Sequence, residues 1–372
     1  MHGVDAGAGR TVPAAYVGFT NEHIAAAMAV LRSGMLASGP EVPAFEQEYA
    51  AFIGARHAIA VSNGTTALEI ALQAYGIGVG AEVITTPFSF FATTAAIVRV
   101  GATPVFADID ERTFLLDTSM LEQLITYRTK AILVVDLFGH MANVEITRKV
   151  ADAHGVALIV DGAQAHGASW RGHRSGSLAT TTFSFYATKN LAIGEGGMIT
   201  TNDDAIAERC RSLRNHGSPA RYVHDTIGTN ARMSEIHGAI GRVSLLHLAA
   251  NNAVRKRNAE ALMARLAPFD LFHLPVTLPD YEHAWHLFTV RIEEERDSLV
   301  RFLNDNGVAA AVHYPTPTYR QPVMVRSDTS ATAPRAERVA SQVLSLPVHP
   351  GVSLPDVEYM VEVVNAWQRQ AR

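Results

Sequence analysis

One lysine in this sequence has the surroundings that a covalent catalyst needs. The chain has four lysines against twenty-seven arginines. Lys189 is the only formally charged residue between Arg174 and Glu195. Apolar surroundings disfavour an ammonium, so the pKa of such a lysine falls toward the range where the free amine attacks carbonyls. This is the chemistry of a Schiff-base lysine. Since a half-buried lysine is more often a paired structural residue, the neighbouring motifs must decide between the two interpretations.

A short polar segment offers a second chemical function, the binding of an anion. Ser62-Asn63-Gly64-Thr65-Thr66 lies between a predicted strand and a predicted helix. The first backbone N–H groups of a helix attract phosphate, and threonine hydroxyls add further donors. The same residues suit a simple helix N-cap equally well. The Gly-Lys pair of a P-loop is missing, so a phosphate site and a cap remain as the two interpretations.

Two further residues suit an aromatic cofactor that contains a nitrogen. Asp161 ends an apolar strand, at the edge where parallel sheets bind their ligands, and a carboxylate there would keep a pyridine nitrogen protonated. Gln164 and His166 follow within one turn, and Phe90, just past Pro87, offers a flat face for a ring. Taken singly, a strand-end aspartate is commonly a cap, and such a phenylalanine commonly belongs to the core.

These features together meet the requirements of one cofactor. Lys189 follows Asp161 by 28 residues, Ser184 lies five residues before the lysine, and Gly194-Glu195-Gly196-Gly197 lets the chain turn tightly after it. Such a set binds pyridoxal 5′-phosphate (PLP) through its phosphate, ring, ring nitrogen and aldehyde. The sequence therefore predicts a PLP site.

The sequence resembles the DegT/DnrJ/EryC1/StrS sugar aminotransferases, which are PLP-dependent enzymes of fold type I. The resemblance covers roughly residues 15 to 365, and its most specific piece is Phe183–Gly197. Further matches, in chain order, are Ser33–Pro40, Gly101–Val105, Asp161–Gly167, Gly228–Met233 and Val312–Pro315.

The resemblance implies roles for the residues around the cofactor. Lys189 would carry PLP covalently, and Asp161 would hold its pyridine nitrogen. Gln164 would contact the ring oxygen, and Phe90 would stack on the ring, where relatives have Trp or Tyr. The implied phosphate contacts are Gly64, Thr65 and Ser184.

The resemblance also implies partners for this chain. Asn230 would reach the phosphate of the neighbouring subunit's cofactor, which implies a homodimer with shared active sites. The residues implied to contact the sugar substrate are His313, Tyr314 and Phe185. The family includes dehydratases with histidine in place of the lysine, and the retention of Lys189 argues against that branch.

The implied activity is a transamination in two stages. An amino donor, glutamate or glutamine, would convert PLP to pyridoxamine 5′-phosphate (PMP). PMP would then aminate a 3-keto- or 4-keto-deoxysugar carried on dTDP or UDP, for a secondary metabolite or a surface glycan. The alternatives are an aminotransferase acting on a ketocyclitol such as scyllo-inosose, and a non-catalytic regulator with this fold. The intact lysine motif and the lack of a basic helix-turn-helix weigh against a regulator.

Elements that could position these residues alternate along the chain. Short apolar strands followed by helices predict an α/β fold with a mostly parallel central sheet, covered by helices on both faces. The expected strands are 58–61, 82–85, 104–107, 131–135, 157–160, 181–184 and 198–201. The expected helices are one starting at Asn21, then 43–52, 66–75, 89–100, 118–127 and 144–154.

The pattern changes near residue 240, and this predicts three parts. These are a flexible N-terminus over 1–12, a large PLP-binding α/β domain over 13–240 and a small α+β domain over 241–372. The elements expected near and after the change are a helix over 234–266, a strand over 285–292 and helices over 297–306 and 356–370.

Composition excludes several other classes of protein. A net charge of −5 without a basic run predicts no nucleic-acid partner, and no apolar stretch reaches the roughly 18 residues of a membrane span. The N-terminus lacks a secretion signal, and the single cysteine, Cys210, excludes an internal disulfide and fits the cytoplasm. We expect no metal site, because His283 and His286 lack further ligands at a recognisable spacing.

Overall fold

The computed structural model describes residues 10–325 and 331–370, and its centre is a seven-stranded sheet. The strand order is β1-β9-β8-β5-β4-β2-β3; β9 runs antiparallel to β1 and β8, and the other pairs are parallel. The strands are β1 His57–Val61, β2 Glu82–Thr85, β3 Thr103–Phe106, β4 Thr129–Val135, β5 Ala157–Asp161, β8 Thr180–Ser184 and β9 Gly197–Thr201. The predicted fold class, α/β with a mostly parallel sheet, is confirmed.

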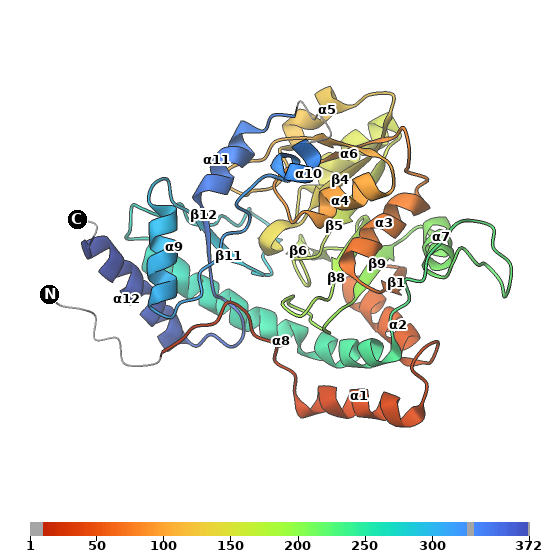
Figure 1. Ribbon diagram of the computed structural model, residues 1–372, viewed down its shortest axis with the longest axis horizontal. Coiled ribbons are helices and arrows are strands. Elements are labelled where there is room, and N and C mark those ends of the chain that lie inside the picture. Colours follow the sequence, from red (N-terminus) through yellow and green to blue (C-terminus); the bar gives the residue numbers. More distant parts are fainter. Residues whose placement is uncertain (1–9, 326–330, 371–372) are drawn as a thin grey trace.

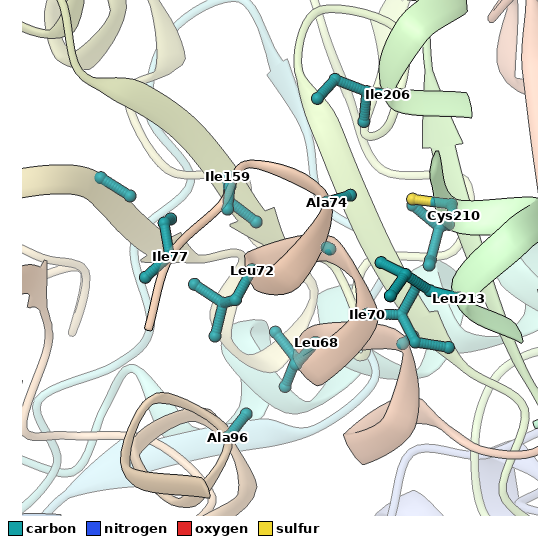
Figure 2. Close-up of a cluster of buried hydrophobic side chains, with 14 of the residues drawn as sticks. Leu68, Ile70, Leu72, Ala74, Ile77, Ala96, Ile159, Ile206, Cys210 and Leu213 are labelled. Carbon is teal, nitrogen blue, oxygen red and sulfur yellow. The ribbon is translucent and has the colours of Figure 1, made fainter. Parts of the chain in front are cut away.

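Helices cover both faces of this sheet because its central strands carry buried apolar side chains on both faces. On one face, Ile59 and Ile159 pack against α3 (Gly64–Ala74), α4 (Ala92–Arg99) and α7 (Asp204–Arg214). Figure 2 shows this cluster, where side chains of α3 meet those of α7. On the other face lie α2 (Glu41–Ile53), α5 (Leu121–Leu124) and α6 (Val144–His154).

Cys210 lies inside the first cluster, on α7. It is fully buried, and burial raises the pKa of its thiol to about 12. A thiol in that state is unreactive, as expected of a passive core residue.

Two of the predicted helices are shorter than the sequence pattern indicates. The helix expected over 118–127 is a 3₁₀ turn at Thr118–Met120 followed by α5, which ends at Leu124. The helix ends there because the backbone at Ile125 is extended. The next residue, Thr126, donates its hydroxyl hydrogen to Glu82 of β2. The helix expected from residue 89 begins only at Ala92, since the preceding residues form a turn at the edge of the sheet.

The long helix α8 (Glu235–Leu266) joins the sheet region to the C-terminal region, as Figure 1 shows. Its first half packs on α1 (Asn21–Ser33) and α2, and its second half packs on α12 (Leu354–Gln370). The remaining C-terminal elements are β11 Phe288–Arg291, α9 Arg296–Asp305, a 3₁₀ turn at Thr318–Arg320, α10 Pro322–Val325, α11 Pro334–Gln342 and β12 Val343–Leu346. A small sheet β10-β6-β7 is formed by Tyr281–Glu282, Ser169–Trp170 and His173–Arg174.

The N-terminal segment belongs with the C-terminal region rather than with the sheet. Val12 is buried in the C-terminal core and forms a bridge with Val308, while Arg10 pairs with Asp356. The prediction of a flexible segment through residue 12 is therefore wrong for residues 10–12, and residues 1–9 lie outside the described part. The boundary at residue 240 falls inside the continuous helix α8, so the division into two domains stays a prediction.

Candidate active site

A cavity of about 800 Å³ opens where β4, β5 and β8 end. Since these strands are parallel, their carboxyl ends lie at one edge of the sheet, the usual ligand site of such folds. Nine of the predicted site residues line this cavity: Gly64, Thr65, Phe90, Asp161, Gln164, Ser184, Lys189, His313 and Tyr314. Segments as distant in sequence as residues 62 and 314 therefore form one site.

The amino group of Lys189 lines the cavity and has no partner among the described residues. Its side chain is half-buried, and its Nζ forms no hydrogen bond or ion pair with any residue in the described part of the chain. Burial lowers the pKa of Lys189 to about 8, and the charge of Asp161 opposes that shift only in part. An amine with this pKa is partly unprotonated near neutral pH, as carbonyl chemistry requires.

Asp161 is buried and held by two donors. Its Oδ2 accepts a hydrogen bond from the Thr93 hydroxyl at 2.7 Å, and its Oδ1 accepts one from the N–H of Ala163 at 3.2 Å. Burial raises the pKa of Asp161, while these two hydrogen bonds and the charge of Lys189 lower it. A cationic ring nitrogen beside this carboxylate would further favour the ionised form.

The segment before α3 is a helix cap whose first N–H groups are suited to an anion. Asn63 caps the helix, because its side chain accepts a hydrogen bond from the N–H of Thr66 at 2.9 Å. The N–H groups of Gly64 and Thr65, in the first turn, have no partner within the helix. A Cβ on Gly64 would lie 2.7 Å from the Cβ of Ser184, so only glycine allows this close approach. The result is a cradle of N–H and O–H donors suited to a phosphate.

His166 fixes the position of Ser184 at this cradle. The hydroxyl of Tyr49 donates to its Nδ1 at 3.1 Å, and its Nε2–H donates to the carbonyl oxygen of Ser184 at 2.8 Å. Burial lowers the pKa of His166 to about 3, so the ring stays neutral and the assigned donor and acceptor roles hold. His166 therefore has a structural role: it holds the backbone of Ser184 without lining the cavity itself.

Gln164, Tyr314 and Phe90 line the same cavity and contact one another through Tyr314. Gln164 accepts a hydrogen bond from the N–H of Phe138 at 2.6 Å and donates one to the hydroxyl of Tyr314 at 2.8 Å. Phe90 is 60 % exposed and leaves a ring face open, with its centroid 6.1 Å from that of Tyr314. An open aromatic face of this kind suits stacking on a flat ligand.

One predicted substrate residue is wrong: Phe185 does not reach the cavity. It is fully buried, with its ring 5.3 Å from that of Phe45 and 5.4 Å from that of Tyr49. The chain stays extended past β8, so successive side chains point to opposite sides. Ser184 and Tyr186 therefore line the cavity, and Phe185 points into the core.

Other site residues were missed, namely Thr93, Tyr186 and His286. Strand alternation from Ser184 would have predicted Tyr186. No local signal marks Thr93 or His286, which are brought to the site by helix α4 and by the segment before β11.

Asn230 lies outside this cavity. It is exposed, in the polypeptide segment 217–232 before α8, and it forms a bridge with Asn215. The single chain therefore does not bring Asn230 to its own Lys189.

In the described ranges no group of three His, Cys, Asp or Glu side chains is arranged to hold a metal ion. None of the helices in those ranges has the length and apolar character of a membrane span.

Comparisons with known proteins identify the family of this chain. The model of the DegT/DnrJ/EryC1/StrS aminotransferase family matches residues 19–365. The chain is 42% identical over 357 residues to the dTDP-3-amino-3,4,6-trideoxy-alpha-D-glucose transaminase of Streptomyces venezuelae, covering 95% of this chain and 94% of the relative. It is 44% identical over 356 residues to the erythromycin biosynthesis sensory transduction protein EryC1 of Saccharopolyspora erythraea, covering 95% of this chain and 97% of that one.

Solved structures show the same architecture. S. venezuelae DesV, in complex with a ketimine intermediate, has a TM-score of 0.91 at 42% identity, over 93% of this chain and 94% of that one. A Streptococcus pneumoniae protein solved in its PLP form has a TM-score of 0.92 at 26% identity, over 98% of this chain and 100% of that one. A family model that spans residues 19–365 and a relative 42% identical over 95% of the chain together show that the chain belongs to the DegT/DnrJ/EryC1/StrS aminotransferase family.

Proposed function

We propose that this protein is a PLP-dependent aminotransferase that moves an amino group from glutamate or glutamine to a nucleotide-linked ketosugar. The observation that carries the proposal is the unpaired Nζ of Lys189, in one cavity with Asp161 and the cradle at Gly64. These residues fit PLP, because they supply an amine for its aldehyde, a carboxylate for its ring nitrogen and donors for its phosphate.

Relatives support the choice of substrate class. Their names include a dTDP-3-amino-3,6-dideoxy-alpha-D-galactopyranose transaminase from Aneurinibacillus thermoaerophilus and a UDP-2-acetamido-2-deoxy-3-oxo-D-glucuronate aminotransferase from Pseudomonas aeruginosa. Both dTDP and UDP carriers occur among them, and the cavity has room for a sugar beside the cofactor. The proposed location is the cytoplasm, to which a single buried cysteine is suited.

Residues of this chain would hold the cofactor and move protons in the cavity. PLP, when bound, supplies an aldehyde and a ring that withdraws electrons. Lys189 would hold that aldehyde until the amino donor displaces it, and its free Nζ would then move a proton between the donor's α-carbon and the cofactor. Asp161 would hold the proton on the ring nitrogen, with Thr93 keeping the carboxylate in place. Phe90, Gln164 and Tyr314 would orient the ring and exclude water.

The proposed assembly is a homodimer with shared sites. Asn230 is exposed and lies outside its own cavity, in a segment that also exposes Tyr222, Val223 and Ile227. Helix α1 exposes a second set of apolar side chains, among them Ile24 and Leu31. Exposed apolar side chains in this number suit a subunit interface, and Asn230 would donate to the phosphate bound by the partner.

A regulatory role is the second candidate, because two relatives have regulatory names. These are EryC1, named as a sensory transduction protein, and a pleiotropic regulatory protein from Geobacillus stearothermophilus that is 42% identical. A complete set of cofactor residues around Lys189 favours catalysis over this alternative.

Two measurements test the proposed function. Borohydride treatment of the PLP-loaded protein, followed by peptide mass spectrometry, is expected to place the pyridoxyl group on Lys189. A panel of dTDP- and UDP-ketosugars and scyllo-inosose, incubated with glutamate or glutamine, is expected to yield an aminosugar by NMR. A label on another side chain would refute the site, and aminated inosose alone would favour the ketocyclitol alternative.

A further inference from the structure

His286 lines the cavity, but it has no assigned role in the proposed transamination. It is 8% exposed and comes just before β11, from the C-terminal region of the chain. Its Nδ1 lies 3.1 Å from the Oδ1 of Asn190, the residue after the catalytic lysine. The donor and acceptor in this pair can be assigned from the surrounding hydrogen bonds.

The orientation of the Asn190 amide is fixed by two acceptors. Its Nδ2 donates to the carbonyl oxygen of Ala284 at 2.8 Å and to the Oδ1 of Asn252 at 2.9 Å. The Asn252 amide is itself oriented, because its Nδ2 donates to the carbonyl oxygen of His166 at 2.8 Å. Both hydrogens on the Asn190 nitrogen are therefore used, and its Oδ1 faces His286.

This arrangement determines the tautomer of His286. An amide oxygen only accepts, so the Nδ1 of His286 must carry a hydrogen. Burial, together with the nearby charges of Lys189 and Arg255, lowers the pKa of His286 well below its usual value, so the ring is neutral. Its Nε2 therefore keeps a lone pair, and within the described ranges the only hydrogen bond of the ring is the one from Nδ1 to Asn190.

The backbone at His286 is also held in place. The guanidinium of Arg255, on α8, is buried and donates to the carbonyl oxygens of Trp285 and His286. The ring nitrogen is thus a fixed, neutral acceptor in a cavity that also holds the donors at Gly64, Thr65 and Lys189 and the carboxylate of Asp161. Such donors suit a phosphate, whereas a sugar hydroxyl also needs an acceptor for its hydrogen.

We propose that the Nε2 of His286 accepts a hydrogen bond from a ring hydroxyl of the sugar, on a carbon next to the one that receives the amino group. The proposal rests on the proposed function, since the reacting carbon must come close to Lys189. His286 is then a specificity-determining residue, because a buried acceptor without its donor disfavours sugars that lack this hydroxyl.

Two substitutions separate this role from a structural one. In His286→Asn the amide group replaces Nδ1, which keeps the link to Asn190 but removes the acceptor in the cavity. In His286→Gln the amide group reaches the place of Nε2, which restores the acceptor. The probe is dTDP-3-amino-3,4,6-trideoxy-α-D-glucose, whose hydroxyl at carbon 2 adjoins the aminated carbon.

We expect His286→Asn to weaken binding of this probe to the PLP-loaded protein roughly tenfold, and His286→Gln to weaken it by no more than about threefold. The 2-deoxy counterpart of the probe should bind wild type roughly tenfold more weakly, and His286→Asn should not distinguish the two. Conversion of PLP to PMP by glutamate, followed by absorbance in a single turnover, should be slowed less by His286→Asn than probe binding is weakened.

Other outcomes would overturn the proposal. Equal weakening in both variants would indicate a structural role. A reaction with glutamate that slows as much as probe binding weakens would mean that His286 acts on Lys189 rather than on the sugar. If wild type fails to react with glutamate, the proposed function fails, while the binding comparison still decides the role of His286. Should the variants not fold, neutron diffraction of wild type decides, since a hydrogen on Nε2 contradicts the proposal and one on Nδ1 supports it.

Discussion

The hydroxyl of Thr93 donates a 2.7 Å hydrogen bond to the Oδ2 of Asp161 and so joins helix α4 to the end of strand β5. Both residues are buried, and Thr93 is itself in contact with the Ser89 hydroxyl at 2.8 Å. The bond stabilises the ionised carboxylate that the cofactor's ring nitrogen would require.

Thr93→Val removes this donor while keeping the shape of the side chain. We expect the affinity for PLP to fall about fivefold to tenfold, because a buried carboxylate loses one of its donors. Fluorescence titration of the cofactor-free protein measures this. The matched control is Thr94→Val, since the Thr94 hydroxyl bonds to Thr318 instead. An equal loss in the control would show that the bond to Asp161 is not the cause.

Gly64→Ala tests the phosphate cradle. The added Cβ would meet the Cβ of Ser184 at 2.7 Å, so strand β8 and helix α3 would have to separate. We expect a loss of about 1–3 kcal/mol in the free energy of unfolding and a PLP affinity at least tenfold weaker. Gly78→Ala is the control, because the nearest atom to its Cβ is the Val100 oxygen at 3.4 Å. Urea unfolding and PLP titration that matched the control would contradict the close approach.

The pKa of Lys189 predicts how fast the cofactor-free protein captures PLP. Since burial lowers that pKa to about 8 and only the free amine attacks, the rate should rise roughly tenfold per pH unit below about 8 and then level off. Stopped-flow absorbance measures the rate. Lys189→Ala should abolish covalent capture, and Lys130→Ala, which removes an exposed lysine, should leave the profile unchanged. A profile still rising steeply near the usual lysine pKa would contradict the assignment.

Asp136 predicts a pH dependence of folding. It is fully buried beside the end of β5, and burial raises its pKa from 3.8 to about 7. The folded protein therefore binds more protons at this site than the unfolded chain between those values, so stability falls as pH rises through that window. Asp136→Asn should remove this penalty while keeping the acceptor for the N–H of Ala142.

The variant should accordingly gain more stability at high pH than at low pH. We expect its gain in the free energy of unfolding to be about 1–3 kcal/mol larger near pH 8 than near pH 5. Urea unfolding of cofactor-free protein at fixed concentration measures the difference. Asp152→Asn, on the exposed face of α6, is the control and should show no such change. A gain of the same size at both pH values would refute the explanation.

The shared-site dimer predicts complementation between inactive variants. Lys189→Ala should be inactive, and Asn230→Ala should bind PLP more weakly. In a mixed dimer, one site would combine the intact Lys189 of one subunit with the intact Asn230 of the other. Unfolding and refolding the two together should therefore restore PLP binding and turnover above the sum of the separate proteins. No restoration in a verified mixed dimer would exclude the assigned role of Asn230.

The sequence by itself determined the parts of the site that lie on short, regular motifs. The apolar strands with Asp161 at the end of one, the capped helix start at Gly64 and the lysine in an uncharged stretch are all local patterns. Burial follows from strand and helix periodicity, so these patterns also determined the parallel sheet and the edge at which the residues meet.

The tertiary structure decided what depends on contacts between distant segments. Packing against Phe45 and Tyr49 decided which side of the extended segment after β8 faces the core, so Phe185 lies in the core and Tyr186 in the cavity. Thr93 reaches Asp161 across 68 residues, and His286 reaches Asn190 across 96, so neither has a local signal. A hydrogen bond of this kind depends on two backbone positions at once, and only the folded chain defines both.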